Sequence, residues 1–126
     1  NKIILHIRDP SKRKVERIQR IQNAKVWTKY SAYCDAMKRR GGCEVKIGGF
    51  WHGTRLHKPE VIWQNDGFLK AKSRIGQCLW FATENTYSMN GFQHVASGGK
   101  HQVFLAFVCC GDTAQVKFIR SNQILN

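Results

Sequence analysis

Acidic residues are scarce in this chain: 8 Asp and Glu stand against 21 Lys and Arg in 126 residues, a formal net charge of +13. Long apolar runs are also missing. No stretch approaches the roughly 18 apolar residues that a membrane-spanning helix needs. The first apolar stretch, Ile3 to Ile7, is interrupted by His6 and is too short for a secretory signal. We therefore expect no membrane partner.

The five cysteines, Cys34, Cys43, Cys78, Cys109 and Cys110, follow no repeated spacing. No pair of them has the CxxC spacing that is typical of zinc sites, so no metal is expected. Cys109 and Cys110 are adjacent, and neighbours on a strand point to opposite faces, which makes a bond between them difficult. Reduced thiols in an intracellular protein, nuclear or cytoplasmic, are favoured over a disulfide framework.

The positive charge is unevenly distributed. Residues 1–40 contain 12 Lys and Arg and 3 Asp and Glu, whereas residues 41–126 contain 9 and 5. Such a field attracts polyanions: nucleic acid, the diphosphate of a dinucleotide or an acidic lipid surface. The alternative is a solvated face whose acidic partner lies elsewhere in a larger protein. The candidate basic patch comprises Lys12, Arg13, Lys14, Arg17, Arg20, Lys38, Arg39 and Arg40.

Apolar spacing predicts an α+β fold. Its clearest element is a helix from Ala24 to Arg40, with Asn23 as N-cap, basic residues in the last turn and Gly41-Gly42 at its end. Shorter helices are expected at Lys58–Gln64 and from a Thr83 cap through Met89; Val15–Gln22 is either a strand or a short helix. Strands are expected at Lys2–Ile7, Val45–Trp51, Cys78–Ala82, Gln102–Cys110 (buried) and Gln115–Ile119.

Five motifs stand in a fixed order along the chain. They are Arg20-Ile21-Gln22-Asn23 with Trp27, Tyr30 and Met37; Phe50 to Thr54 followed by Gly67-Phe68; Gly76 to Ala82 followed by Tyr87-Ser88; Val103 to Gly111; and Val116 to Gln123. In this order, over about residues 15–124, they resemble the catalytic domain of the poly(ADP-ribose) polymerase (PARP) family, in a form like its mono-ADP-ribosyltransferases.

The resemblance implies a single domain over residues 1–126 with the ADP-ribosyltransferase fold. In that fold, two small, mostly antiparallel sheets form a cleft for NAD, with one long N-terminal helix. Residues 1–14 would be a basic extension, and the family's final strand would be missing. The implied activity transfers ADP-ribose from the co-substrate NAD to a protein or nucleic-acid acceptor and releases nicotinamide. Catalysis of this kind depends mainly on orientation and electrostatics.

The resemblance also implies roles for individual residues. His52 would donate a hydrogen bond to the adenosine-ribose hydroxyls, and the Gly53 backbone would pair with the nicotinamide amide. Ser88 would bind the same amide, and Phe92 would stack on the nicotinamide ring. The cofactor-binding set is completed by Thr54 and Phe81.

Two positions of the family's His–Tyr–Glu triad are altered, so that the expected catalytic set is His52, Trp80 and Gln115. The indole of Trp80 has no hydroxyl to meet the nicotinamide ribose. The neutral amide of Gln115 cannot supply the charge of a carboxylate. We therefore expect transfer of a single ADP-ribose unit and no polymer. The alternative is a catalytically inactive PARP-like protein that serves as a basic binding or scaffold module, for nucleic acid among other partners.

Overall fold

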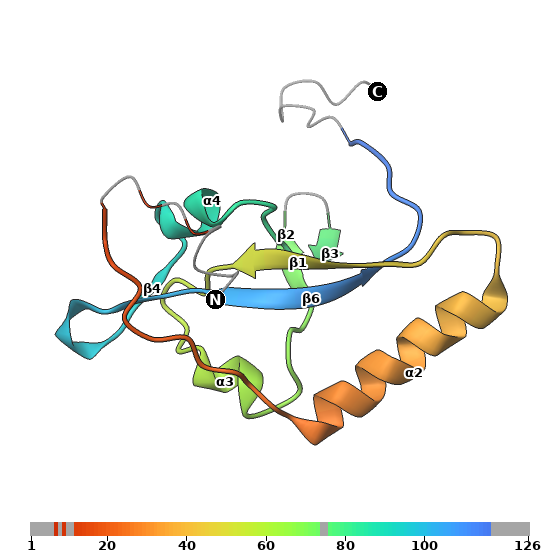
Figure 1. Ribbon diagram of the computed structural model, residues 1–126, viewed down its shortest axis with the longest axis horizontal. Helices are drawn as coiled ribbons and strands as arrows, with labels where there is room; N and C mark the ends of the chain where they lie inside the picture. The colour runs from red at the N-terminus through yellow and green to blue at the C-terminus, as the bar shows by residue number, and fades with distance from the viewer. Residues whose placement is uncertain (1–6, 8, 10–11, 74–75, 117–126) are drawn as a thin grey trace.

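The computed structural model describes residues 7, 9, 12–73 and 76–116 (Figure 1). Within these ranges the chain forms three two-stranded antiparallel sheets and three α-helices. The helices are α2 (Ala24–Arg40), α3 (Glu60–Trp63) and α4 (Asn85–Met89), and Ser97–Gly99 forms a 3-10 turn. The strands are β1 (Lys46–His52), β2 (Ala71–Ser73), β3 (Gly76–Cys78), β4 (His94–Val95), β5 (His101–Gln102) and β6 (Phe104–Cys110).

The longest sheet pairs β1 with β6, in a register that runs from Lys46 opposite Cys110 to His52 opposite Phe104. Trp51 extends the pairing on the other side of β1, because its backbone N–H and C=O both bond to Ala82 at 2.8 Å. Trp51 and Ala82 are consequently buried. The ladder thus joins the C-terminal part of the described chain to two segments in its middle.

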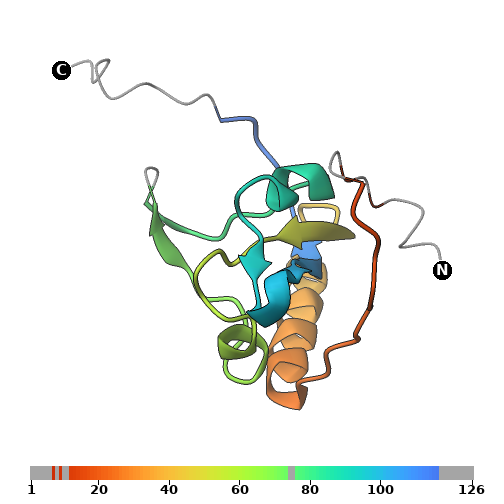
Figure 2. The ribbon, with the colours of Figure 1, turned by 90° about the vertical axis from the view of Figure 1, so that its left-hand side faces the viewer.

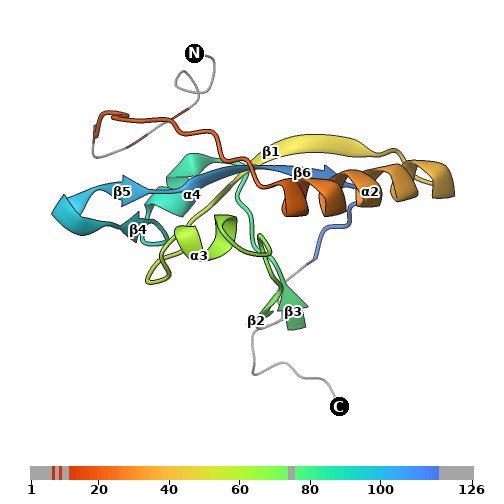
Figure 3. The same ribbon diagram turned by 90° about the horizontal axis from the view of Figure 1, so that it is seen from below.

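Helix α2 lies beside the C-terminal half of β6 (Figure 3). Its buried side chains are Cys34 and Met37, and the Cys109 thiol lies 3.8 Å from the Met37 sulfur. The hydrophobic core is small: among the described residues, only Cys34, Met37, Trp51 and Ala82 are buried apolar side chains. All five cysteines are free thiols.

Asn23 joins α2 to the segment that contains α3. Its side-chain oxygen accepts a hydrogen bond from the Val26 amide at 3.2 Å, which caps α2. Its side-chain nitrogen donates to the carbonyls of Trp63 (2.8 Å) and Asn65 (2.9 Å). The side-chain amide of Asn23 therefore provides a hydrogen-bond acceptor for a free N–H at the start of α2 and donors for two free carbonyls at the end of α3.

The sequence predicts several elements correctly. The helix Ala24–Arg40 and its Asn23 cap are confirmed. The strand expected at Val45–Trp51 is found at Lys46–His52, and the short helix expected at Lys58–Gln64 is found at Glu60–Trp63. The helix expected up to Met89 begins at Asn85, but its N-cap is Glu84, so the assignment of Thr83 as the cap is wrong.

Other expectations are wrong. Val15–Gln22 is neither strand nor helix but runs without regular structure down one side of the molecule to α2 (Figure 2). No strand spans Cys78–Ala82: Cys78 is the last residue of β3, and Ala82 makes an isolated bridge to Trp51. The strand expected at Gln102–Cys110 is interrupted at Val103, and it is half-buried, with Phe107 exposed.

Two expected strands fall largely outside the described residues. Of Lys2–Ile7, only Ile7 is described, and it lies in no strand. Of Gln115–Ile119, the described residues Gln115 and Val116 lie in no strand.

Replacing Asn23 by Ala should lower the free energy of unfolding by about 2 kcal/mol, because the helix cap and the hydrogen bonds to two carbonyls are lost together. Chemical denaturation measures this change. The matched control is Gln22→Ala, since Gln22 is exposed and precedes the cap; we expect it to stay within about 0.5 kcal/mol of the parent. Equal effects of the two substitutions would contradict the role of Asn23.

Alkaline pH should destabilise the contact between α2 and β6. Burial and a hydrogen bond to Cys34 raise the pKa of Tyr30 to about 12. A hydrogen bond to Cys34 raises the pKa of Cys109 to about 11. Because both pKa values are higher in the folded state, the unfolded chain loses these protons first. The stability that the neutral groups contribute is therefore complete below pH 9.0 and is lost as the pH rises toward 12.

Denaturation midpoints measured across this pH range test the prediction. Tyr30→Phe should make the alkaline decline shallower, since one of the ionising groups is removed. Tyr33 lies three positions along the same helix, and its side chain is exposed. Tyr33→Phe should therefore leave the decline of the denaturation midpoint with pH as it is in the parent. An unchanged decline in Tyr30→Phe would show that the Tyr30 hydroxyl does not titrate as described.

Candidate functional site

An aromatic cluster surrounds His52 at the end of β1. The His52 ring lies 5.0 Å from Phe68 and 5.5 Å from Phe81, measured between ring centroids. Phe68 also contacts Phe81 and Phe104, each at 5.3 Å and edge to face. The ladder supplies part of this arrangement, because Phe104 is the residue paired with His52. Four segments of the chain therefore place one imidazole in an apolar surrounding.

A backbone carbonyl fixes the orientation of the imidazole. His52 Nδ1 lies 2.7 Å from the carbonyl oxygen of Trp80. A carbonyl can only accept, so Nδ1 must carry the proton, and the neutral ring then presents the lone pair of Nε2. The resemblance implied that His52 donates to a ribose hydroxyl. In its neutral form, the ring oriented in this way would instead accept from that hydroxyl.

Gly53 lies directly against the backbone of Phe92. A Cβ atom at Gly53 would be 2.1 Å from the Phe92 carbonyl oxygen, a distance that no side chain can occupy. The backbone of Gly53 makes no hydrogen bond to another described residue. It therefore offers one donor and one acceptor, side by side, which is the complement of a primary carboxamide.

Arg55 and Tyr87 both engage the ring of Phe92. The Arg55 guanidinium carbon lies 4.3 Å from the ring centroid, and its Nε donates to the Gly91 carbonyl at 3.1 Å. The Arg55 amide donates to the Phe92 carbonyl at 2.9 Å, from a backbone with a positive φ of 52°. The Tyr87 ring stacks on Phe92 at 5.1 Å and 14°. These contacts hold the ring of Phe92, the residue whose backbone lies against Gly53.

Arg55 and Tyr87 are the residues that reasoning from the sequence missed. Arg55 directly follows Phe50–Thr54, and Tyr87 belongs to the Tyr87-Ser88 motif, but neither side chain was assigned a role in the site. A basic residue beside a glycine and an aromatic residue beside a serine are not specific signals. Their contact with Phe92 exists only in three dimensions.

The two hydroxyls of the expected set are both buried. Ser88 lies in α4, which packs against β1, and is 2% exposed. Thr54 is 8% exposed, and its hydroxyl donates to the His57 carbonyl at 2.6 Å. The Thr54 hydroxyl therefore stabilises the turn after β1. The same hydroxyl proton is then not free to be donated to a ligand.

The altered triad positions lie in different places. Trp80 is adjacent to His52 through its carbonyl, while its side chain is 46% exposed. Gln115 lies five residues beyond Cys110, past the end of the ladder opposite to His52. At roughly 3.4 Å per residue, those ladder ends are about 20 Å apart. The structure brings together His52, Gly53, Thr54, Phe81 and Phe92, but no described contact joins Gln115 to them.

The candidate basic patch is divided into two clusters. Lys12, Arg13, Lys14, Arg17 and Arg20 precede α2, whereas Lys38, Arg39 and Arg40 form its last turn. At roughly 1.5 Å per residue, the 17 residues of α2 span about 25 Å between the two clusters. The eight basic residues therefore do not form one continuous surface.

Neither a metal centre nor a membrane-spanning helix is found among the described residues. No three His, Cys, Asp or Glu side chains among them gather where they could hold a metal ion. None of the described helices has the length and apolar character required to cross a bilayer.

Comparison with known proteins gives a distant similarity. The chain is 30% identical over 105 residues to the protein mono-ADP-ribosyltransferase PARP12 of mouse, an alignment that covers 78% of this chain. The chain spans 14% of the length of that relative. No family model matches the chain, and no solved structure matches it. The similarity indicates a PARP-like catalytic domain at most, with which the small α+β arrangement of few antiparallel strands is compatible.

Gly53→Ala should destabilise the fold by about 2 kcal/mol or more, because the new methyl group overlaps a backbone carbonyl that cannot move aside as a side chain would. Thermal unfolding measures the loss. Gly49→Ala is the matched control on the same strand, since its Cβ would meet Leu105 at an ordinary 3.4 Å. If Gly53→Ala melts like Gly49→Ala, the close approach of Gly53 and Phe92 is not a constraint in solution.

Proposed function

We propose that this chain is an NAD-dependent mono-ADP-ribosyltransferase domain, which transfers one ADP-ribose unit from NAD to a protein or nucleic-acid acceptor. The observation that carries the proposal is the meeting of His52, the open backbone of Gly53 and the aromatic residues Phe81 and Phe92 at one end of the β1–β6 ladder. The similarity to a mono-ADP-ribosyltransferase supports it from an independent direction.

The residues fit the two parts of NAD in a simple way. The N–H and C=O of Gly53 complement the carboxamide of nicotinamide, which has one acceptor and one donor group. His52, held by the Trp80 carbonyl, presents Nε2 to a ribose hydroxyl. The apolar rings beside His52 cover part of the imidazole and strengthen its interaction with the ribose.

In the proposed reaction, the bond between the ribose C1′ and the nicotinamide nitrogen breaks. The electron pair of that bond leaves with nicotinamide, which departs as a neutral molecule, and positive charge develops on the ribose. An acceptor oxygen or nitrogen then bonds to C1′ and loses its proton to solvent. The protein contributes mainly by orienting the two ends of NAD, since no carboxylate is placed beside His52 by the described contacts.

Phe92 imposes a condition on nicotinamide binding. Its ring is already stacked with Tyr87 and lies under the Arg55 guanidinium. A nicotinamide ring can therefore stack on the face that Tyr87 uses only after Tyr87 has moved. Tyr87 is 62% exposed, so its side chain has solvent into which it can turn.

The altered triad favours a second candidate, a PARP-like protein without transferase activity that acts as a binding module. Trp80 has no hydroxyl, and Gln115 lies beyond the far end of the ladder. In that case the Phe92 stack would be a permanent part of the fold rather than a ligand site.

Calorimetry with NAD separates the two candidates. We expect the parent chain to bind NAD and His52→Ala to bind at least about tenfold more weakly, a loss of about 1.4 kcal/mol. His57→Ala is the matched control, because His57 is exposed and takes part in the Thr54 turn only through its backbone. Labelled NAD then measures transfer to the chain itself, to peptides and to nucleic acid.

Absence of NAD binding by the parent chain would overturn the transferase and support the binding module. Binding without transfer or hydrolysis would retain the ligand site and remove the activity.

A further inference from the structure

Residues 12–22, here named the strap, contain a repeat of three residues. Lys14-Val15-Glu16 is followed by Arg17-Ile18-Gln19 and Arg20-Ile21-Gln22, so each triplet has a basic, an aliphatic and a polar residue. The three aliphatic side chains are equally half-exposed, at 39%, 42% and 42%. An extended chain with about three residues per turn places every third side chain on one side. Lys14, Arg17 and Arg20, which recur at every third position of this exposed segment, are here named the row of basic residues.

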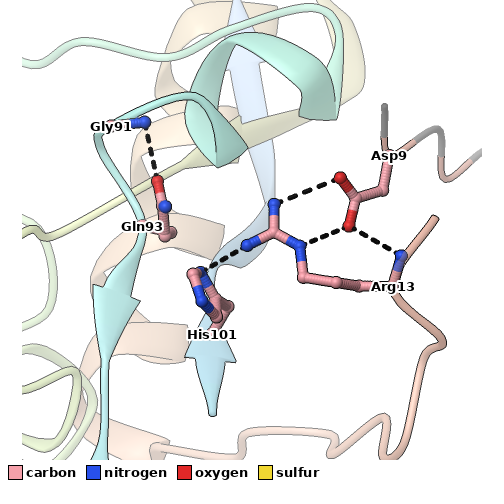
Figure 4. Close-up of polar contacts among 5 residues, drawn as sticks. All are labelled: Asp9, Arg13, Gly91, Gln93 and His101. Carbon is pink, nitrogen blue, oxygen red and sulfur yellow. Dashed lines mark hydrogen bonds and ion pairs between the residues drawn. The ribbon is translucent and has the colours of Figure 1, made fainter. Parts of the chain in front are cut away.

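The strap is fixed to the hairpin of β4 and β5 by two polar contacts. Arg13 Nε lies 2.5 Å from a carboxylate oxygen of Asp9, and Arg13 Nη1 lies 2.6 Å from His101 Nδ1 (Figure 4). Glu16 forms an ion pair with Lys100 on the same hairpin. At its other end the strap continues into Asn23, whose side chain is fully used. A segment without regular structure is thus held in place before any ligand arrives.

The row of basic residues has no acidic partner among the residues that the structure describes. All eight Asp and Glu of the sequence are among the described residues. The two nearest in sequence, Asp9 and Glu16, are paired with Arg13 and Lys100. None of the eight pairs with Lys12, Lys14, Arg17 or Arg20, all of which are exposed.

The second basic cluster has an intramolecular explanation that the strap lacks. Lys38, Arg39 and Arg40 form the last turn of α2, where positive charge is favourable beside the free carbonyls of the helix end. The strap contains no helix, so its like charges repel one another with no such compensation. An anionic ligand along the strap would remove that repulsion.

We propose that the strap binds the phosphodiester backbone of a nucleic acid, through Lys14, Arg17 and Arg20, without reading its sequence. Release of counterions drives such binding, and a strap that is already fixed loses little conformational entropy. An acidic membrane is the less favoured partner, because only three aliphatic side chains, each 39% to 42% exposed, are available in the strap to insert. The site is separate from His52 and does not depend on the transferase activity.

Fluorescence anisotropy with a labelled oligouridylate of about 20 nucleotides tests the proposal, with salt varied from about 50 to 200 mM. Lys14→Gln/Arg17→Gln/Arg20→Gln is compared with Lys38→Gln/Arg39→Gln/Arg40→Gln, which removes the same charge from the other cluster. Each lost phosphate contact on a single strand lowers the slope of log affinity against log salt by about 0.7. We expect the strap variant to flatten this slope by about 2 and the helix variant to leave it within about 0.5.

If the slope of log affinity against log salt flattened equally in the two variants, the proposal would be overturned. Binding would then depend on the net charge of the protein and not on the position of the charges in the strap. The proposal would also be overturned if the strap variant kept the parent's slope, or if the strap substitutions abolished binding to phosphatidylserine vesicles but not to the oligonucleotide. Thermal unfolding of both variants checks that they remain folded, as expected for exposed residues without ion pairs. A duplex of the same length shows whether the strap prefers single strands.

Discussion

Seven paired positions hold β1 and β6 together, and the two ends of that ladder contact different parts of the protein. At one end His52 meets Phe104 and the rings around it; at the other, Cys109 meets Met37 of α2. A shift of the register by one residue would turn every side chain to the opposite face of the sheet and separate both groups at once. With so few buried apolar side chains elsewhere, little else in the described chain could compensate for such a shift.

Local signals determined what could be predicted from the sequence. Helix α2 has an N-cap, an apolar stripe and a glycine stop within its own residues, so its limits were predictable. The segment before Ala82 was not, because its backbone serves His52 through the Trp80 carbonyl instead of forming a strand. The neighbourhood of His52 and Gly53 was expected from the family resemblance. The engagement of Phe92 by Arg55 could not be foreseen, since a cation over a ring leaves no pattern in the sequence.

Binding and chemistry are distributed differently over this protein. Under the proposed function, the groups that would hold a carboxamide and a ribose lie together at the end of β1, whereas Gln115, the expected position of a catalytic carboxylate, lies past the other end of the ladder. A protein of this kind can retain recognition of a ligand after much of the charge that promotes reaction has been lost. The pronounced basic character belongs to neither task, since it is concentrated before and at the end of α2.

The contact between Gly53 and Phe92 also has a mechanical consequence. The Phe92 carbonyl lies against the Gly53 Cα and accepts the Arg55 amide, so the loop that carries Phe92 is coupled to β1 and must move with it. On the opposite side of His52, Phe81 is connected to β1 through the neighbouring backbone of Trp80 and Ala82. Both neighbouring segments are therefore tied to β1 through the backbone, and room for a bulky ligand has to come from rotation of exposed side chains such as Tyr87.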